Sequence, residues 1–325
     1  MPVMITHDTS VDYDVHGKSG PHLLLIGGLG FGRWGWFKQI PTLSRHFRAV
    51  SFDVRGEPDP AQSIADLSAE AVALLEHLKV RKAHVLGTSL GGFVAQRLAL
   101  DRPDLVDRLV LVCTSYGGPG PELMSPDALG RMFGMGSLSP ESAVRRGLET
   151  ATSEAYREGY SEEFERIVHW RLADSPSLPA YYQRAMAGAR FDASSEVGNI
   201  ASPTLVIHGS DDRYVPVANA VALAEAIPDA RLRILDGAGH LVFIERAREV
   251  NKEIVSFLEP RKRPQKPPAK PKRKQLVERA RKAIPFLEKP RKPRKAKRGS
   301  ALGKLKGWLR RPPRILGGRG SRRRG

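Results

Sequence analysis

The sequence predicts an α/β fold in which a mostly parallel central sheet carries helices on both faces. Three observations indicate this: short apolar strand-like runs, helical patterns between them, and a central stretch where this alternation stops. Because the strand-like runs are almost continuously apolar, both faces of the sheet are expected to be buried. The predicted organisation is a core of residues 1–118 and 196–260, a helical cap at 119–195 and a basic tail at 261–325.

Six strand-like runs define the expected sheet. Each is short, rich in Val, Leu and Ile, and ends near a Gly, an Asp or the cysteine. They are residues 22–28, 48–53, 83–87, 108–113, 204–209 and 231–237. Apolar residues spaced by three or four predict amphipathic helices between the strands. These helices are expected at residues 64–79, 90–101, 217–227 and 245–258. Strands that alternate with helices are typical of a parallel sheet.

The alternation stops in the segment from residue 119 to residue 195, which contains no strand-like run. Its pieces "SPESAVRRGLETATSEAYREGY" and "EEFERIVHWRLA" have helical patterns, with Ser and Pro at the start of the first. We therefore expect a helical cap over the core. Its large apolar side chains are candidates to line a substrate pocket: Met132, Phe133, Met135, Trp170, Tyr181 and Tyr182. The alternative is that they pack the cap helices against one another.

The net charge of +18 is distributed very unevenly over the 325 residues. Residues 261–325 hold 27 Lys and Arg but 2 Asp and Glu, which leaves 26 basic and 33 acidic side chains before them, a net charge of −7. A tail this rich in Pro, Lys and Arg is expected to be disordered. The positive charge of the tail would attract phosphate groups, so the tail is expected to bind anionic membrane surfaces or, nonspecifically, nucleic acid. The alternative is a solvated tail that binds polyanions weakly.

The cysteine content and the N-terminal sequence are used to predict the cellular compartment. The chain has one cysteine, Cys113, so no disulfide within the chain is expected, and a small buried side chain is the simplest interpretation. The N-terminal residues do not show the basic segment followed by an apolar segment that is typical of a signal sequence. No segment approaches the ~20 apolar residues that a membrane-spanning helix needs. These features predict a cytoplasmic protein, with attachment to an anionic membrane surface through the tail as an open alternative.

The segment "VLGTSLGGF" contains a candidate nucleophile. Gly87, Ser89 and Gly91 fit the pattern G-x-S-x-G between a predicted strand and a predicted helix. A sharp strand-to-helix turn strains the serine backbone and exposes its hydroxyl, while the glycines leave room for neighbouring backbone. The N–H of Leu90 then lies at a helix N-terminus, where a developing oxyanion is stabilised.

A serine nucleophile needs a base and an orienting acid, which in this fold follow in the order Ser, Asp or Glu, His. The strand "TLVIHG" is followed by "SDDRYVP", and the strand "RLRILDG" is followed by "AGH". Both loops should lie at the sheet edge that carries Ser89. The predicted catalytic set is therefore Ser89, Asp212 and His240. The second oxyanion N–H is expected from Leu29, in the loop after the strand at 22–28.

Together, "GTSLGG", "HGSDDRYVP", "DGAGH" and "FDVRG" resemble the α/β-hydrolase fold family over residues 10–259. The pattern is similar to its capped serine hydrolases, which include proline iminopeptidases, enol-lactonases and carbon–carbon bond hydrolases. The resemblance implies that Asp212 rather than Asp211 is the acid. The sequence departs from the family at Gly27, where a histidine is common, and at "EPDPAQS", where a glycine-rich stretch ending in serine is usual.

The expected function is hydrolysis of a carboxylic ester, lactone or thioester through an acyl-enzyme on Ser89. Carbon–carbon bond hydrolysis, aminopeptidase activity and perhydrolysis by the same residues stay open, as does a main role in binding polyanions through the tail. The histidines show no HExxH-type spacing, and "GGLGFG" is a poor match to a dinucleotide loop, so no metal and no cofactor are expected. The expected partner is a small acyl substrate.

Overall fold

The structure is a computed structural model that describes residues 2–5, 10–55, 60–118, 120, 122–133 and 138–259. All of the described residues belong to one compact unit of the chain. The basic tail predicted at 261–325 lies outside the described residues. Within the described part of the chain, no helix combines the length and apolar character that a membrane span requires.

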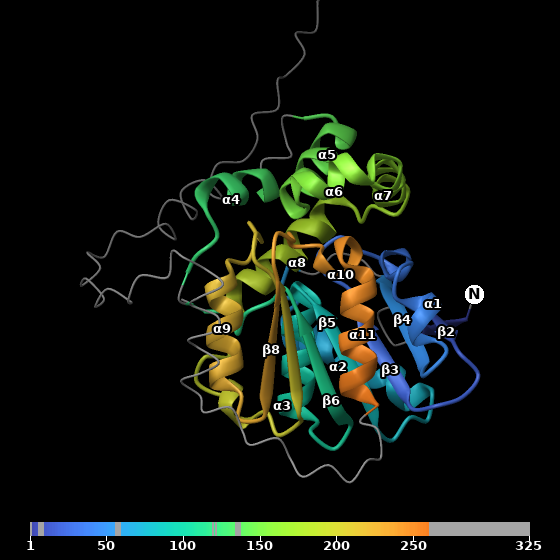
Figure 1. The fold of residues 1–325 in the computed structure, drawn as a ribbon. Helices are drawn as coiled ribbons and strands as arrows, with labels where there is room; N and C mark the ends of the chain where they lie inside the picture. The colour runs from blue at the N-terminus through green and yellow to red at the C-terminus, as the bar shows by residue number, and fades with distance from the viewer. Residues whose placement is uncertain are drawn as a thin grey trace, which may run out of the picture. The chain divides into compact units, whose positions relative to one another are not determined.

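The described residues form one eight-stranded sheet (Figure 1). Its strands are β1 (Val3–Ile5), β2 (Ser10–His16), β3 (His22–Ile26), β4 (Arg48–Arg55), β5 (Ala83–Thr88), β6 (Val106–Val112), β7 (Thr204–Gly209) and β8 (Ala230–Leu235). The spatial order is β1-β2-β4-β3-β5-β6-β7-β8. The pairs β1–β2 and β2–β4 are antiparallel, and the strands from β4 to β8 are parallel. The predicted fold class is confirmed.

Helices cover both faces of the sheet and form a hydrophobic core with each face. Successive side chains of the central strands therefore enter opposite cores. In β3, Leu24 and Ile26 belong to one core and Leu23 and Leu25 to the other. The first core is shared with α2 (Ile64–His77), α3 (Leu90–Asp101) and α9 (Val217–Ala226). The second is shared with α1 (Ile40–Leu43), α10 (Val242–Glu245) and α11 (Ala247–Leu258). The 3-10 helices η1 (Arg33–Trp36) and η3 (Val197–Asn199) also contribute buried residues to these cores.

Among the described residues between β6 and β7, five α-helices form the cap. They are α4 (Pro126–Phe133), α5 (Pro140–Ala151), α6 (Glu154–Gly159), α7 (Ser161–Ala173) and α8 (Leu178–Arg190). Ser139, Ser153 and Ser177 start three of these helices, and each side-chain oxygen accepts a hydrogen bond from a backbone N–H in the first turn. Ser153 therefore divides the long helical pattern of the sequence into α5 and α6.

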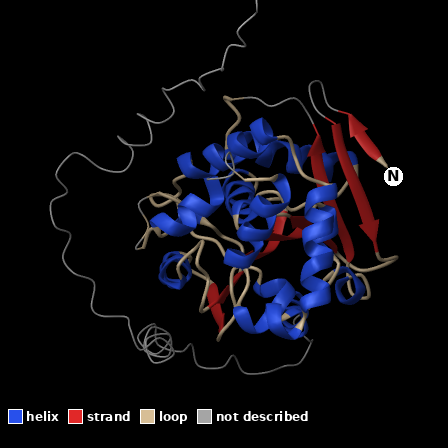
Figure 2. Ribbon diagram, turned by 90° about the horizontal axis from the view of Figure 1, so that it is seen from above, coloured by secondary structure: helices blue, strands red, loops and turns tan. Residues whose placement is uncertain are grey.

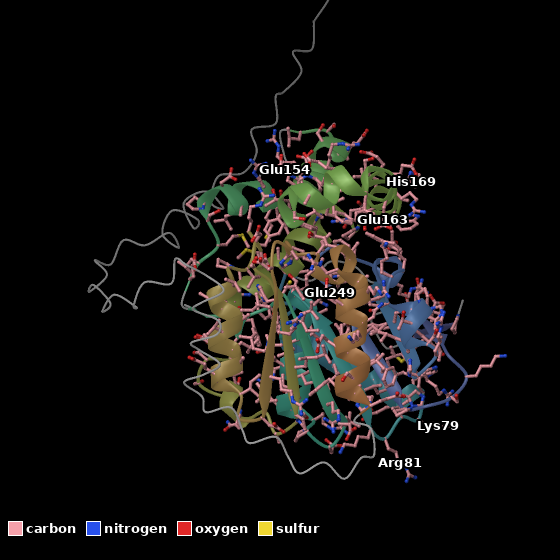
Figure 3. The ribbon with its side chains drawn as sticks, in the orientation of Figure 1. Lys79, Arg81, Glu154, Glu163, His169 and Glu249 are labelled. Carbon is pink, nitrogen blue, oxygen red and sulfur yellow. The ribbon has the colours of Figure 1, made fainter. Side chains whose placement is uncertain are left out.

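The cap lies over the carboxyl edge of the parallel strands. Glu163 and His169 on α7 lie at one end of the sheet, while Lys79 and Arg81, which precede β5, lie at the other (Figure 3). Seen from above, the helices gather over the sheet and the N-terminal strand lies at its rim (Figure 2). The cap is joined to the core by an ion pair between Lys38 and Glu163, 2.5 Å from nitrogen to oxygen. The loops after β5, β7 and β8 therefore open toward the cap.

Candidate active site

Ser89 stands at the turn between β5 and α3 in a strained backbone conformation. Its φ is 54° and its ψ is −121°, in the left-handed region that non-glycine residues rarely adopt. The surrounding structure holds this strain, because the Ser89 N–H donates to the Val112 carbonyl at 2.9 Å and the Ser89 carbonyl accepts from Gly92 N–H at 2.8 Å. The Thr114 hydroxyl donates to the same carbonyl at 2.9 Å. Strain kept at a half-buried serine is typical of a functional position.

The glycines on either side of Ser89 are required by space. A Cβ at Gly91 would overlap the carbonyl of Ile26, and a Cβ at Gly87 would overlap the carbonyl of Gly91. The start of α3 therefore packs directly on the end of β3. This close approach brings the loop after β3 against Ser89: a Cβ at Gly28 would lie 3.2 Å from the Ser89 Cβ.

Leu90 and Leu29 are the two residues whose backbone N–H groups were expected to stabilise an oxyanion. Leu90 is the first residue of α3, where a backbone N–H has no partner inside the helix. Leu29 lies in the tight loop after β3, in which the Phe31 N–H donates to the Gly28 carbonyl at 3.1 Å. A Cβ at Gly27 would approach the Phe31 carbonyl to 2.7 Å, so glycine has a steric reason to replace the family's histidine here.

Asp212 and His240 come together from the loops after β7 and β8. His240 Nδ1 lies 2.7 Å from Asp212 Oδ2, and the aspartate side chain is completely buried. The other oxygen, Oδ1, accepts from the backbone N–H groups of Tyr214 at 2.9 Å and Val215 at 2.8 Å. Because Oδ1 is held by the backbone, Oδ2 is fixed toward the imidazole. Asp211 is exposed and accepts a hydrogen bond from the Ser210 hydroxyl instead.

A second imidazole contacts the buried acid. His208 Nε2 lies 3.2 Å from Asp212 Oδ2 and 2.8 Å from the Val215 carbonyl, which indicates that Nε2 carries the proton. Burial alone would raise the pKa of Asp212, but the charges and hydrogen bonds of His240 and His208 lower it well below its usual range. His240 is thus held by a carboxylate that stays ionised throughout the physiological range.

Cys113 lies behind this acid at the end of β6 and is fully buried. Its Sγ, His208 and Asp212 offer ligand atoms within 4.8 Å of one another. The carboxylate and imidazole atoms of this group already bind one another and the backbone, which accounts for the cluster without an ion. Burial and the neighbouring Asp212 raise the pKa of the Cys113 thiol well above its ordinary value, so it is suited to packing rather than to nucleophilic chemistry.

Ser89 and His240 open into one cavity of about 90 Å³ between the core and the cap. Met132 and Tyr181, two of the pocket candidates from the sequence, are among the residues that line it. Trp170, also a pocket candidate, is not among the residues that line this cavity. Its ring packs against Trp34 and Phe37, with centroids 6.1 and 5.0 Å away.

Of the remaining pocket candidates, Tyr182 has a described side chain and Phe133 and Met135 do not. Tyr182 is not among the residues around the cavity, and its ring lies edge-on to Tyr181 at 6.0 Å. The side chain of Phe133 and all of Met135 lie outside the described residues.

Among the cavity residues that were not expected from the sequence, Tyr214 and Arg171 carry polar groups close to the candidate site. Tyr214 places its ring 5.4 Å from the His240 ring, and its hydroxyl donates to the Gly147 carbonyl of the cap at 3.0 Å. Arg171 is a buried cation on α7 that lines the same cavity. A signal for it exists in the sequence, since Arg171 continues the buried face that Phe164, Ile167 and Val168 form on α7.

Comparisons with known proteins agree with this architecture. Residues 21–247 match the family model described as alpha/beta hydrolase fold. A putative carbamate hydrolase, RutD, of Agrobacterium fabrum is 31% identical over 266 residues, covering 76% of this chain and 98% of the relative. A putative non-heme bromoperoxidase, BpoC, of Mycobacterium tuberculosis is 29% identical, covering 75% and 96%. The solved enol-lactonase of Burkholderia xenovorans LB400 superimposes with a TM-score of 0.70 at 26% identity, covering 79% and 99%.

Proposed function

The chain belongs to the α/β-hydrolase fold family, and on that premise we propose that it is a serine hydrolase that cleaves a carboxylic ester, lactone or thioester. One observation carries the proposal. A serine with a φ of 54° faces the same cavity as a histidine whose Nδ1 lies 2.7 Å from a buried aspartate. Nucleophile, base and orienting acid are the three parts that acyl transfer through serine requires.

In the first half of the proposed reaction, the Nε2 atom of His240 takes the proton from the Ser89 hydroxyl. The Ser89 oxygen attacks the substrate carbonyl carbon, and the carbonyl electrons move to its oxygen. The backbone N–H groups of Leu90 and Leu29 stabilise this oxyanion. When the carbonyl re-forms, the bond to the leaving oxygen or sulfur breaks, and His240 returns the proton to the leaving group.

The second half of the reaction uses the same groups with water. His240 takes a proton from a water molecule, whose oxygen attacks the acyl carbon bound to Ser89. The bond to Ser89 breaks, the serine oxygen regains the proton, and the carboxylic acid leaves. Asp212 holds the His240 tautomer and stabilises its protonated form in both halves. Ester and water thus give acid and alcohol, with every proton returned.

The test is hydrolysis of 4-nitrophenyl acetate by wild type and by Ser89→Ala. We expect kcat/KM to fall at least about 1,000-fold, because removal of a catalytic serine leaves only binding and oxyanion stabilisation. Ser115→Ala is the matched control. Ser115 follows β6, just as Ser89 follows the neighbouring strand β5. Its hydroxyl accepts a hydrogen bond from the Gly117 N–H, and it is not among the residues that line the cavity. Undiminished hydrolysis by Ser89→Ala would refute the proposal.

Perhydrolysis is a second candidate, favoured by the likeness to the putative bromoperoxidase. In that reaction hydrogen peroxide, rather than water, attacks the acyl carbon on Ser89 and releases a peracid. Addition of hydrogen peroxide to the ester assay distinguishes the two. Peracid formed in proportion to peroxide, and lost in Ser89→Ala, supports perhydrolysis, whereas acid alone supports hydrolysis.

The basic tail of residues 261–325 has a separate proposed role at anionic surfaces. Its charge supports the idea, since 27 Lys and Arg stand against 2 Asp and Glu. Co-sedimentation with vesicles that contain phosphatidylserine compares the full chain with a variant ended at residue 260. Binding by the full chain that falls with salt and disappears on truncation supports the role. Equal sedimentation of both would contradict it.

A further inference from the structure

The proposed catalytic cavity contains a positive charge that the reaction does not use. This charge is on Arg171, which lies on α7 of the cap, lines the cavity and is 8% exposed. Arginine stays protonated in proteins, so this is a buried cation. Burial lowers the pKa of Arg171, while the nearby Tyr181 and Asp174 act in the opposite direction.

The hydrogen-bond partners of Arg171 do not include a carboxylate among the described residues. Its Nη1 donates to the Ser175 hydroxyl at 3.0 Å, and the guanidinium carbon lies 5.7 Å from the centre of the Tyr181 ring. Among the described residues, no carboxylate oxygen lies within 4.0 Å of its nitrogens. A buried charge without an opposite charge is costly, and proteins keep such a group where a ligand supplies the missing partner.

The guanidinium also lies beside the reacting atoms. It packs against Gly30 so closely that a Cβ there would overlap Nη2. Gly30 follows Leu29, the proposed oxyanion donor, and is two residues from Gly28, which borders Ser89. Two residues span at most about 7 Å. A substrate whose carbonyl reaches Ser89 therefore passes close to the cation.

The second arginine of the cavity is a useful contrast. Arg131 on α4 also lines the cavity, but its Nε lies 2.9 Å from Asp127 Oδ2 at an exposed position. Its charge is therefore already paired at the surface. Most of the other lining residues are apolar or aromatic, including Phe31, Leu148 and Phe243. Arg171 is thus the cation in this lining that a buried anionic ligand can pair with.

We propose that the cavity accepts small substrates that carry a carboxylate, and that Arg171 binds this carboxylate through its planar pair of N–H donors. The inference rests on the proposed function, since it places the anion relative to Ser89. Arginine presents two parallel N–H groups that match the two oxygens of a carboxylate. The cavity of about 90 Å³ is smaller than the ~150 Å³ that holds benzene, so the acyl compound is short.

The test measures protection of Ser89 from a neutral fluorophosphonate probe, with each protein compared with itself in the absence of ligand. Succinate is the anionic ligand, and succinamide is its uncharged counterpart of similar shape. We expect saturating succinate to slow labelling of wild type at least 10-fold and succinamide to slow it far less. Arg166→Met is the matched control, because Arg166 lies on the same helix with its side chain 61% exposed. It should keep the protection.

Arg171→Met should raise the succinate concentration needed for half-maximal protection about 10- to 100-fold. This is the range expected for loss of a charged hydrogen-bonded contact. Arg171→Lys retains the charge without the planar pair, so it should keep part of the protection. This second variant also serves if the methionine variant does not fold. Equal protection of wild type and either Arg171 variant, or no protection of wild type, would overturn the inference.

Failure of this inference can be separated from failure of the proposed function. If wild type is labelled at Ser89 but succinate gives no protection, only the role of Arg171 is refuted. If Ser89 is not labelled at all, the nucleophile assignment fails. Calorimetric titration of succinate into wild type and Arg171→Lys then measures the anion site alone. Equal affinities, or no binding to wild type, would refute that site as well.

Discussion

Replacing Asp212 with asparagine should remove most of the activity while it leaves the shape of the side chain unchanged. The amide oxygen can still accept from the Tyr214 and Val215 N–H groups that now bind Oδ1. The amide NH₂ then takes the place of Oδ2 and faces two N–H donors, His240 Nδ1 and His208 Nε2. Donors would meet donors on that side, and His240 would be held in the tautomer that cannot take the serine proton.

The magnitude follows from these contacts. Loss of the correct imidazole tautomer lowers kcat about 10⁴-fold in the Ser-His-Asp chemistry, equivalent to about 5.4 kcal/mol at the transition state. Two buried hydrogen bonds to a charged oxygen are also lost, each worth about 1.5–3 kcal/mol. We therefore expect the free energy of unfolding to fall by at least about 3 kcal/mol. For a domain of this size, that lowers Tm by about 6–12 °C.

The assay combines ester hydrolysis with thermal unfolding, and Asp211→Asn is the matched control. Asp211 undergoes the same chemical change one residue away, but it is exposed and bonded to Ser210. Its kcat should stay within about twofold and its stability within about 0.5 kcal/mol of wild type. Near-normal activity of Asp212→Asn, or an equal loss in Asp211→Asn, would refute the assignment of the acid.

Three further outcomes are expected. The pKa of Asp212 is below its ordinary value of 3.8, so the stability that its charged form contributes is complete above about pH 4 and is lost as the pH falls further. In urea unfolding, the difference in stability between wild type and Asp212→Asn should therefore narrow below about pH 4. A difference that stays constant would contradict this. Gly91→Ala should lose activity and at least about 1–3 kcal/mol of stability, because its Cβ overlaps the Ile26 carbonyl; full activity would show that the elbow can relax. The buried Cys113 thiol, with its raised pKa, should not react with Ellman's reagent at pH 8 until the chain unfolds, and rapid reaction of the native protein would contradict its burial.

The central fold was predictable because its strands and helices have strong local signals. The expected helix at 90–101 coincides with α3, and the strand runs at 83–87 and 204–209 match β5 and β7 within a residue. The first two strands were not predicted. In β2, Val11 and Tyr13 are buried while alternate residues are polar, so the antiparallel edge has period-two patterning rather than an apolar run. Similarly, the pattern at 245–258 does not show that Arg246 separates α10 from α11.

The site was predictable where chemistry and chain order restrict the choice. Ser89, Asp212 and His240 follow strands whose carboxyl ends share one edge, and the structure brings the last two into direct contact. The cavity lining was less predictable, because it depends on how each cap helix is rotated over the core. Trp170 and Arg171 are neighbours on α7, yet the tryptophan packs on Trp34 and the arginine faces the cavity. One residue on a helix changes direction by about 100°, and no local pattern fixes that rotation.

Labelling with a fluorophosphonate probe, followed by peptide mapping, tests the central claim most directly, since it needs no knowledge of the substrate. The account predicts that Ser89 alone is modified in wild type and that His240→Ala loses the reaction, because the serine hydroxyl then has no base. Modification of a different residue, or unchanged labelling of Ser89 in His240→Ala, would contradict it.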